Sequence, residues 1–154
     1  MIFGDWTSTS RRIGAPVAFA VVALIGAQRS GSPAREIIGT WRGTAVCANR
    51  AKDLTCRDET VIYDVGTIGA ARGNVMLRAH KMVNRDRQFM YAMQFKLIPG
   101  SHTWQSDFTE STFHGRWEYT VNGSVMTGRL IELPSKRLVR RVSVRRADPI
   151  RRGN

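Results

Sequence analysis

The sequence predicts an all-β protein in which eight antiparallel strands follow one another around a closed up-and-down barrel. After residue 38, apolar and polar residues alternate with period 2 through most of the chain, as they do in strands that bury one face. Clusters of Gly, Asn, Asp and Pro separate these runs, and no run has the periodicity of a helix. Because closing a sheet removes its exposed edges, a barrel is favoured over the alternative, a two-sheet β-sandwich.

The turns define the individual strands. Val121-Asn122-Gly123 is the clearest turn, since Asn and Gly both tolerate the positive φ angles of a type I′ hairpin. The glycine-rich segment 66–73 is the longest loop. The eight strands expected from these signals are residues 39–47, 58–65, 74–83, 87–97, 102–108, 113–121, 124–133 and 137–146.

The same alternation assigns the inward face of each strand. The fourth strand is the clearest case, because its apolar residues share one side while Gln88, Gln94 and Lys96 share the other. A barrel of eight strands either fills its interior with such side chains or leaves room for one small ligand. The side chains expected inside are Trp41, Gly43 and Ala45 on the first strand; Val61, Tyr63 and Val65 on the second; Val75, Leu77, Ala79 and then Lys81 on the third; Phe89, Tyr91, Met93, Phe95 and Leu97 on the fourth; and Phe113, Trp117, Tyr119 and Val121 on the sixth.

The N-terminal segment has the pattern of an export signal. Arg11 and Arg12 precede an apolar run over residues 13–27 that ends in small residues. This run is shorter than the roughly 20 residues of a membrane span. We therefore expect a signal peptide that is cleaved after Ala27 or Ala34, with an uncleaved anchor as the alternative, and export to the periplasm or beyond the cell.

The length of 154 residues suits a single folded domain with a real core. The expected organisation is a signal peptide over residues 1–27, a linker over 28–38, the barrel over 39–146 and a basic tail over 147–154.

The chain contains two cysteines, Cys47 and Cys56. An even pair in an exported chain predicts a disulfide, which would close a short loop at the end of the first strand. A metal or redox pair is the weaker alternative, because the spacing is not C-x-x-C and no histidine lies nearby.

The formal net charge of +12 favours an anionic partner such as an acidic glycan or an anionic lipid surface. Nucleic acid is not expected for an exported protein whose basic stripe lacks aromatic residues for base stacking. The simpler interpretation of the stripe is a solvated strand face followed by a tail. The cations of the expected outward stripe are Arg137, Arg141, Arg145, Arg146, Arg151 and Arg152.

Gly39-Thr40-Trp41 at the first strand resembles the G-x-W signature of the calycin superfamily, which includes the lipocalins and avidins. In those families the tryptophan crosses the closed end of the barrel, and an arginine of the last strand packs on its ring. The resemblance implies that Arg140 fills this role here, because it falls on the same face of the last strand as Val142 and Val144. Taken as a whole, the chain resembles the small exported lipocalin-like proteins of bacteria, a group without an assigned function.

The segment 39–43, GTWRG, also resembles the start of nitrobindin-like heme barrels, but Ala45 stands where those proteins continue with another glycine. Those barrels carry a heme-ligating histidine near the C-terminus, whereas the histidines here are His80, His102 and His114. Heme is therefore not expected, and neither is any other cofactor or metal.

No catalytic constellation is visible in the sequence, so an enzyme has the least support of three function classes. The favoured class is non-catalytic binding of a small, partly apolar ligand inside the barrel, with an anionic ligand as one option. The rival is a filled barrel that acts through its arginine stripe on anionic lipid or glycan. Lys81 at the barrel mouth could hold a carboxylate, although the favoured interpretation is that its stem covers apolar surface while its amine reaches water. The candidate ligand-binding residues are Lys81, Tyr63, Tyr91, Phe89 and Trp117.

Overall fold

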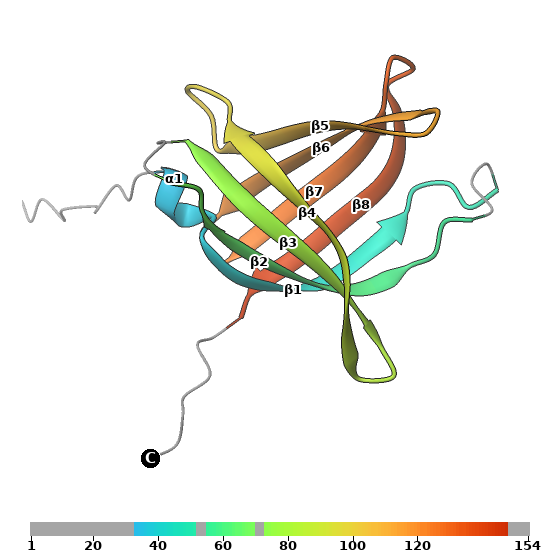
Figure 1. Ribbon diagram of the computed structural model, residues 1–154, viewed down its shortest axis with the longest axis horizontal. Helices are drawn as coiled ribbons and strands as arrows, with labels where there is room; N and C mark the ends of the chain where they lie inside the picture. Colours follow the sequence, from blue (N-terminus) through green and yellow to red (C-terminus); the bar gives the residue numbers. More distant parts are fainter. Residues whose placement is uncertain (1–32, 52–54, 70–72, 148–154) are drawn as a thin grey trace, which may run out of the picture.

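The computed structural model describes residues 33–51, 55–69 and 73–147, which form an eight-stranded antiparallel β-barrel (Figure 1). The predicted signal peptide, residues 28–32 of the predicted linker and nearly all of the basic tail lie outside the described residues. A one-turn helix, α1 (Pro33–Glu36), precedes the barrel and was not predicted. The strands are β1 (Gly39–Cys47), β2 (Glu59–Thr67), β3 (Asn74–Val83), β4 (Asp86–Leu97), β5 (Thr103–Glu110), β6 (Phe113–Asn122), β7 (Val125–Glu132) and β8 (Arg137–Arg146).

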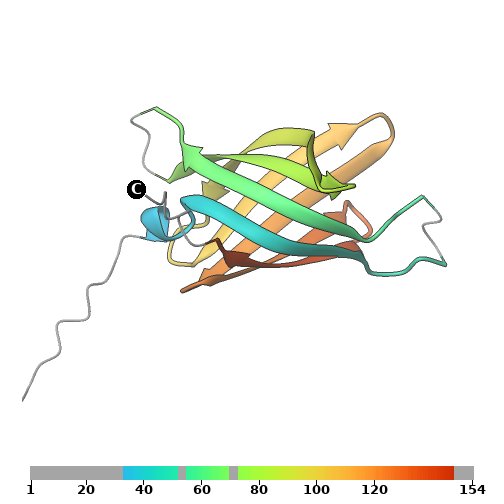
Figure 2. The ribbon, with the colours of Figure 1, turned by 90° about the horizontal axis from the view of Figure 1, so that it is seen from below.

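Each strand pairs with its neighbours in chain order, and β1 pairs with β8 to close the barrel. The predicted barrel is therefore confirmed and the β-sandwich alternative is wrong. Helix α1 lies at one end of the barrel, while the β1–β2, β3–β4, β5–β6 and β7–β8 connections all lie at the other (Figures 1 and 2). Among the described residues, none of the helical segments has the length and apolar character needed to cross a membrane.

The inward faces form one continuous core. Its largest fully buried side chains include Trp41, Trp104, Tyr63, Tyr119 and Phe95. Each of the five is inward because it lies on the apolar side of its strand, and together they fill the half of the barrel nearest α1. Large aromatic side chains of this kind each bury a large apolar area and so contribute strongly to the stability of the core.

Two hairpin turns differ from the expected geometry. Residues Asn122 and Val125 pair directly, so the β6–β7 turn is centred on Gly123 and Ser124, with positive φ at Gly123 only among the two. The type I′ turn predicted at Asn122-Gly123 is wrong, because the turn lies one residue later and only its first central residue has positive φ. Positive φ at two successive central residues occurs instead in the β3–β4 turn, at Asn84 and Arg85.

A β-bulge in β4 reverses one predicted side chain. Ala79 of β3 pairs with Tyr91 while His80 pairs with Phe89, so Met90 is an extra residue in β4. Phe89 therefore points outward, is 61% exposed and packs edge-on against His80. The prediction that Phe89 lies inside the barrel is wrong, because strict alternation does not survive an inserted residue.

A second bulge lies in β8. Leu130 of β7 pairs with Arg140 and Ile131 pairs with Leu138, which leaves Val139 as the extra residue. Val139 is buried as a result, whereas Leu138 is only half-buried and turns to the outer face.

The wall of the barrel is weakest between β4 and β5. Within the described chain, these strands form only two paired positions, Lys96 with Gln105 and Leu97 with Trp104. Both pairs lie at the α1 end, so the two strands separate toward the opposite end. That separation leaves room beside the interior in the same half of the barrel as the cavity described next.

Candidate ligand-binding cavity

The barrel end next to α1 is closed by Trp41. The Trp41 side chain is fully buried, and its indole N–H donates a hydrogen bond of 2.8 Å to the Ile37 carbonyl. The guanidinium carbon of Arg146 lies 4.3 Å from the centre of the indole ring, within cation–π distance. The same guanidinium donates to the carbonyls of Glu36 and Ile38, the latter at 2.6 Å. The arginine therefore fastens the segment before β1 to the end of β8.

The prediction that Arg140 stacks on Trp41 is wrong, and so is the placement of Arg146 in the outward stripe. Trp41 pairs in register with Arg146, whereas Arg140 pairs with Cys47 at the opposite end of β1. Antiparallel pairing brings the start of β1 to the end of β8, so the arginine nearest the C-terminus of the strand is the one that can reach Trp41.

The two glycines around Trp41 make this closure possible. Gly39 has φ of +132°, and a Cβ there would lie 2.8 Å from the Arg146 guanidinium. A Cβ at Gly43 would lie 2.1 Å from the Ser143 carbonyl oxygen, because the β8 backbone approaches closely. Only glycine fits at either position without local rearrangement.

A cavity of about 720 Å³ occupies the opposite end of the barrel, the mouth. This volume lies within the range of roughly 300–1,000 Å³ that is usual for small-molecule sites. Its wall includes both strands that separate, β4 and β5, and both bulged residues. The lining residues are Thr55, Cys56, Met90, Tyr91, Met93, Phe108, Thr109, Glu110, Trp117, Leu130, Val139 and Arg140.

Aromatic rings form the floor and one wall of the cavity. Trp117 stacks on Tyr119 below it, with ring centres 5.5 Å apart and planes inclined by 11°. Tyr91 lies beside Trp117 at 6.4 Å with an inclination of 25°. Such offset, nearly parallel rings present a flat surface that suits a planar or extended apolar group.

Three tyrosine hydroxyls gather below this surface. The Tyr119 hydroxyl is buried and has no partner at full hydrogen-bond geometry among the described residues, although the Tyr63 and Tyr91 hydroxyls lie close enough to affect its pKa. Burial raises the pKa of Tyr119 and of Tyr91 well above the usual value, and it raises the pKa of Tyr63 to about 12. All three phenols are therefore neutral at physiological pH, and the Tyr119 hydroxyl keeps an unused capacity to donate or accept a hydrogen bond.

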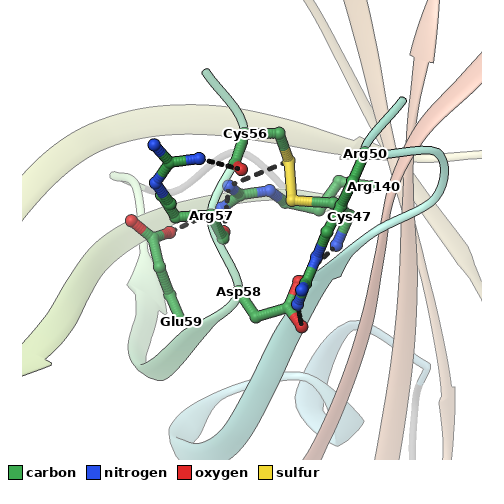
Figure 3. Close-up of a disulfide and its surroundings, with 7 residues drawn as sticks. All are labelled: Cys47, Arg50, Cys56, Arg57, Asp58, Glu59 and Arg140. Atoms are coloured by element: carbon green, nitrogen blue, oxygen red, sulfur yellow. Dashed lines mark hydrogen bonds and ion pairs between the residues drawn. A yellow bond between two sulfur atoms is a disulfide. The ribbon is translucent and has the colours of Figure 1, made fainter. Parts of the chain in front are cut away.

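Arg140 lies at the rim of the cavity, where its charge is already matched. It donates to the Glu59 carboxylate at 2.5 Å and to the Arg57 carbonyl at 2.8 Å, and its Nη2 lies 3.6 Å from the Cys56 sulfur (Figure 3). The Arg140 side chain is 17% exposed. Because Glu59 neutralises it, Arg140 braces the mouth and leaves little unpaired positive charge inside the cavity.

The predicted disulfide between Cys47 and Cys56 is confirmed, with Cα atoms 6.0 Å apart (Figure 3). It ties the end of β1 to the segment before β2, so that Cys56 becomes part of the cavity wall. Asp58 strengthens the same loop by accepting a 2.9 Å bond from the Cys47 amide and an ion pair from Arg50. The Cys47 amide is the main reason that the pKa of Asp58 is lowered.

The predicted ligand-binding residues divide into three groups. Tyr91 and Trp117 line the cavity, and Tyr63 lies among the phenols beneath it. Lys81 pairs with the buried Val61 but is not part of the cavity wall, and Phe89 points away from it. Among the other lining residues, Cys56 and Arg140 were singled out from the sequence for different roles, Met93 was placed in the inward stripe of the fourth strand, and the rest were not singled out.

The predicted basic stripe is smaller than expected. Arg137 forms an ion pair with Glu132 at 2.9 Å, and this arginine lowers the pKa of Glu132 to about 2. Arg146 belongs to the closed end, while Arg151 and Arg152 lie outside the described residues. Arg141 and Arg145 remain as exposed outward cations of β8.

Within the part of the chain that the structure describes, no three His, Cys, Asp or Glu side chains gather closely enough to hold a metal ion. None of the protein-family models matches the chain, and no curated protein matches it significantly.

Proposed function

We propose that the protein binds a small, mostly apolar and uncharged ligand in the mouth cavity. The observation that carries this proposal is an open cavity of about 720 Å³ at the mouth of the barrel, with Tyr91, Trp117, Met90 and Met93 in its wall. A pocket that is largely apolar, with few polar groups to fix orientation, is the usual form of a small-molecule site.

The wall chemistry narrows the ligand class. Met90 and Met93 supply flexible apolar contacts, and the Tyr91–Trp117 surface favours a flat or extended group. The matched charge of Arg140 and the presence of Glu110 in the wall argue against a strongly anionic ligand. A flat or extended ligand with few polar groups fits best, because the Tyr119 hydroxyl lies beneath the Trp117 ring and does not line the cavity.

Binding of a neutral lipophilic dye, Nile red, followed by fluorescence, tests the site. Met93→Trp adds bulk to the cavity and should weaken binding by about tenfold or more, as expected when the void is filled. Ala92→Trp is the matched control, because Ala92 is exposed on the same strand and points outward. Equal dye affinity of the two variants, with both folded by circular dichroism, would refute the mouth cavity as the site.

Tyr119→Phe tests whether the buried Tyr119 hydroxyl lacks a hydrogen-bond partner. Removing an unsatisfied buried hydroxyl should raise the free energy of unfolding by about 1 kcal/mol in the absence of ligand. The same change should leave the affinity for a ligand in the mouth cavity nearly unchanged, because Tyr119 does not line the cavity. A drop in the stability of the ligand-free variant would show that the hydroxyl already has a partner.

We also propose that the protein is exported and is a lipocalin-like member of the calycin group. The apolar run over residues 13–27, the Cys47–Cys56 disulfide and the Trp41 closure support this proposal. Expression with and without residues 1–27, followed by fractionation, tests it. Cytoplasmic retention of the full chain with free thiols would contradict export.

A further inference from the structure

A second concave surface lies on the outside of the barrel. It is a groove of about 770 Å³ that crosses β5, β6, β7, β8 and β1. It shares none of its lining residues with the mouth cavity in the described part of the chain. Any ligand held there would be independent of the one proposed for the interior.

A row of five hydroxyl side chains crosses the groove from strand to strand. Thr44 pairs in register with Ser143, Ser143 with Thr127, Thr127 with Thr120, and Thr120 with Thr103. Residues directly opposite one another point to the same face, so these hydroxyls lie side by side about 5 Å apart. Thr103 and Thr120 are within 3.2 Å of each other, whereas Thr44, Ser143 and Thr127 are exposed to solvent.

Arginines flank this hydroxyl row on both sides, and they occur as like-charged pairs. Arg129 lies directly opposite Arg141 on one side of the row, and Arg42 lies directly opposite Arg145 on the other. Like charges in direct register destabilise a sheet. Glu118 offsets one of them through a 2.6 Å ion pair with Arg129. Among the described residues, Arg42, Arg141 and Arg145 have no carboxylate partner.

We propose that this groove, the arginine-flanked groove, binds an acidic polysaccharide. The sugar hydroxyls would hydrogen-bond to the hydroxyl row, and carboxylate or sulfate groups would pair with the arginines on each side. Bringing an anion to each arginine pair relieves the repulsion that the sheet carries without a ligand.

The spacing of the arginines favours a polymer over a small anion. Arg141 and Arg145 are four residues apart on β8, which corresponds to roughly 13 Å along the strand. One sulfate or carboxylate cannot reach both, whereas a chain with repeated charges can contact both pairs and the hydroxyls between them.

Two other polyanions fit the groove less well. A bilayer surface is bound most strongly where apolar side chains insert beside the cations, and Val46 is the one large apolar residue of the described groove that is clearly exposed. Single-stranded nucleic acid requires aromatic platforms, and none lines the groove in the described chain. Its concave, hydroxyl-rich surface suits a polymer that carries both hydroxyls and charges.

Isothermal titration with heparin and with polygalacturonate tests the proposal, alongside dextran, single-stranded DNA and vesicles that contain phosphatidylglycerol. Both acidic polysaccharides should bind at low salt, dextran should not, and binding should weaken as salt screens the arginines. Replacing Arg42, Arg141 and Arg145 together by Gln should weaken polysaccharide binding by about tenfold or more. Replacing the exposed Arg78, Arg85 and Lys96 by Gln is the control, because it removes the same charge elsewhere, and it should change affinity by less than about threefold.

The double variant Thr44→Val, Thr127→Val tests the hydroxyl row without altering charge or strand propensity. It should weaken polysaccharide binding by about fivefold while leaving the salt dependence unchanged. Equal losses in the groove and control arginine variants would overturn the proposal, since net charge alone would then explain binding. Stronger binding to vesicles or DNA than to either polysaccharide, or an undisturbed affinity of the valine variant, would overturn it as well.

Discussion

Replacing Arg146 by alanine should destabilise the barrel strongly. Of the described arginines that belong to neither the groove nor the mouth cavity, Arg146 is the one whose replacement should cost the most stability. Arg146 contacts the face of Trp41 and donates to two backbone carbonyls, those of Glu36 and Ile38. Alanine removes all three contacts at once and leaves both carbonyls at the closed end of the barrel without their donor.

The magnitude follows from these contacts. A partly buried cation–π contact contributes about 1–2 kcal/mol, and each hydrogen bond from a charged donor about 1.5–3 kcal/mol. Ordering the arginine side chain costs up to about 2 kcal/mol. The net loss is therefore about 3–5 kcal/mol, which should lower the melting temperature of a domain of this size by roughly 10–20 °C.

Thermal and urea unfolding followed by circular dichroism measure this loss. Arg146→Lys should recover less than half of it, because an ammonium cannot reproduce a planar stack with two parallel donors. Arg145→Ala is the control: its side chain is exposed, and the change should stay within about 0.5 kcal/mol. If Arg146→Ala melts within about 2 °C of the wild type, or if Arg145→Ala is equally harmful, the Trp41–Arg146 contact does not close the barrel.

Three further predictions concern stability. Gly39→Ala should cost about 1–3 kcal/mol in urea unfolding, because φ is +132° and the new methyl would meet Arg146; an unchanged midpoint would show that the strand relaxes freely. Replacing Cys47 and Cys56 by serine should lower the free energy of unfolding by about 2–3 kcal/mol, measured in urea against the oxidised wild type. A loss smaller than about 1 kcal/mol would mean that the ion pairs of the loop hold it without the disulfide. Burial raises the pKa of Tyr63 to about 12 in the folded protein, whereas an ordinary tyrosine has a pKa of 10.0. Because Tyr63 therefore loses its proton more readily in the unfolded chain, the free energy of unfolding should fall as pH rises from about 10 to 12. Tyr63→Phe should flatten that fall, and a wild-type midpoint independent of pH in this window would contradict the assignment.

The strand pattern was predictable because it depends on local alternation. Every strand lies within two residues of its expected bounds, and the pairing of β1 with β8 follows from closing the sheet. The disulfide was predictable for a similar reason, since nine residues of sequence separation place Cys47 and Cys56 at the two ends of one short connection.

The residues whose positions were predicted incorrectly were misplaced for a different reason. Alternation predicted the inward face of Arg140 correctly but was not applied to Arg146, which was placed in the outward stripe. The level of each arginine along the barrel axis depends on the register between strands about 100 residues apart. The outward turn of Phe89 depends on Met90, whose insertion is defined by the partner strand and not by its own neighbours in sequence. Alternation within one strand contains neither piece of information.

The two bulges explain why the mouth is hollow while the opposite end is full. Both extra residues, Met90 and Val139, line the cavity, and both lie in the half of the barrel that contains it. Without the bulge in β4, Phe89 would point inward and its ring would occupy the mouth beside Tyr91. The inserted residue sends that ring to the surface and leaves a flexible methionine in its place. Because β4 also separates from β5 in this half, the bulge and the short β4–β5 pairing together leave a space that aromatic side chains would otherwise fill.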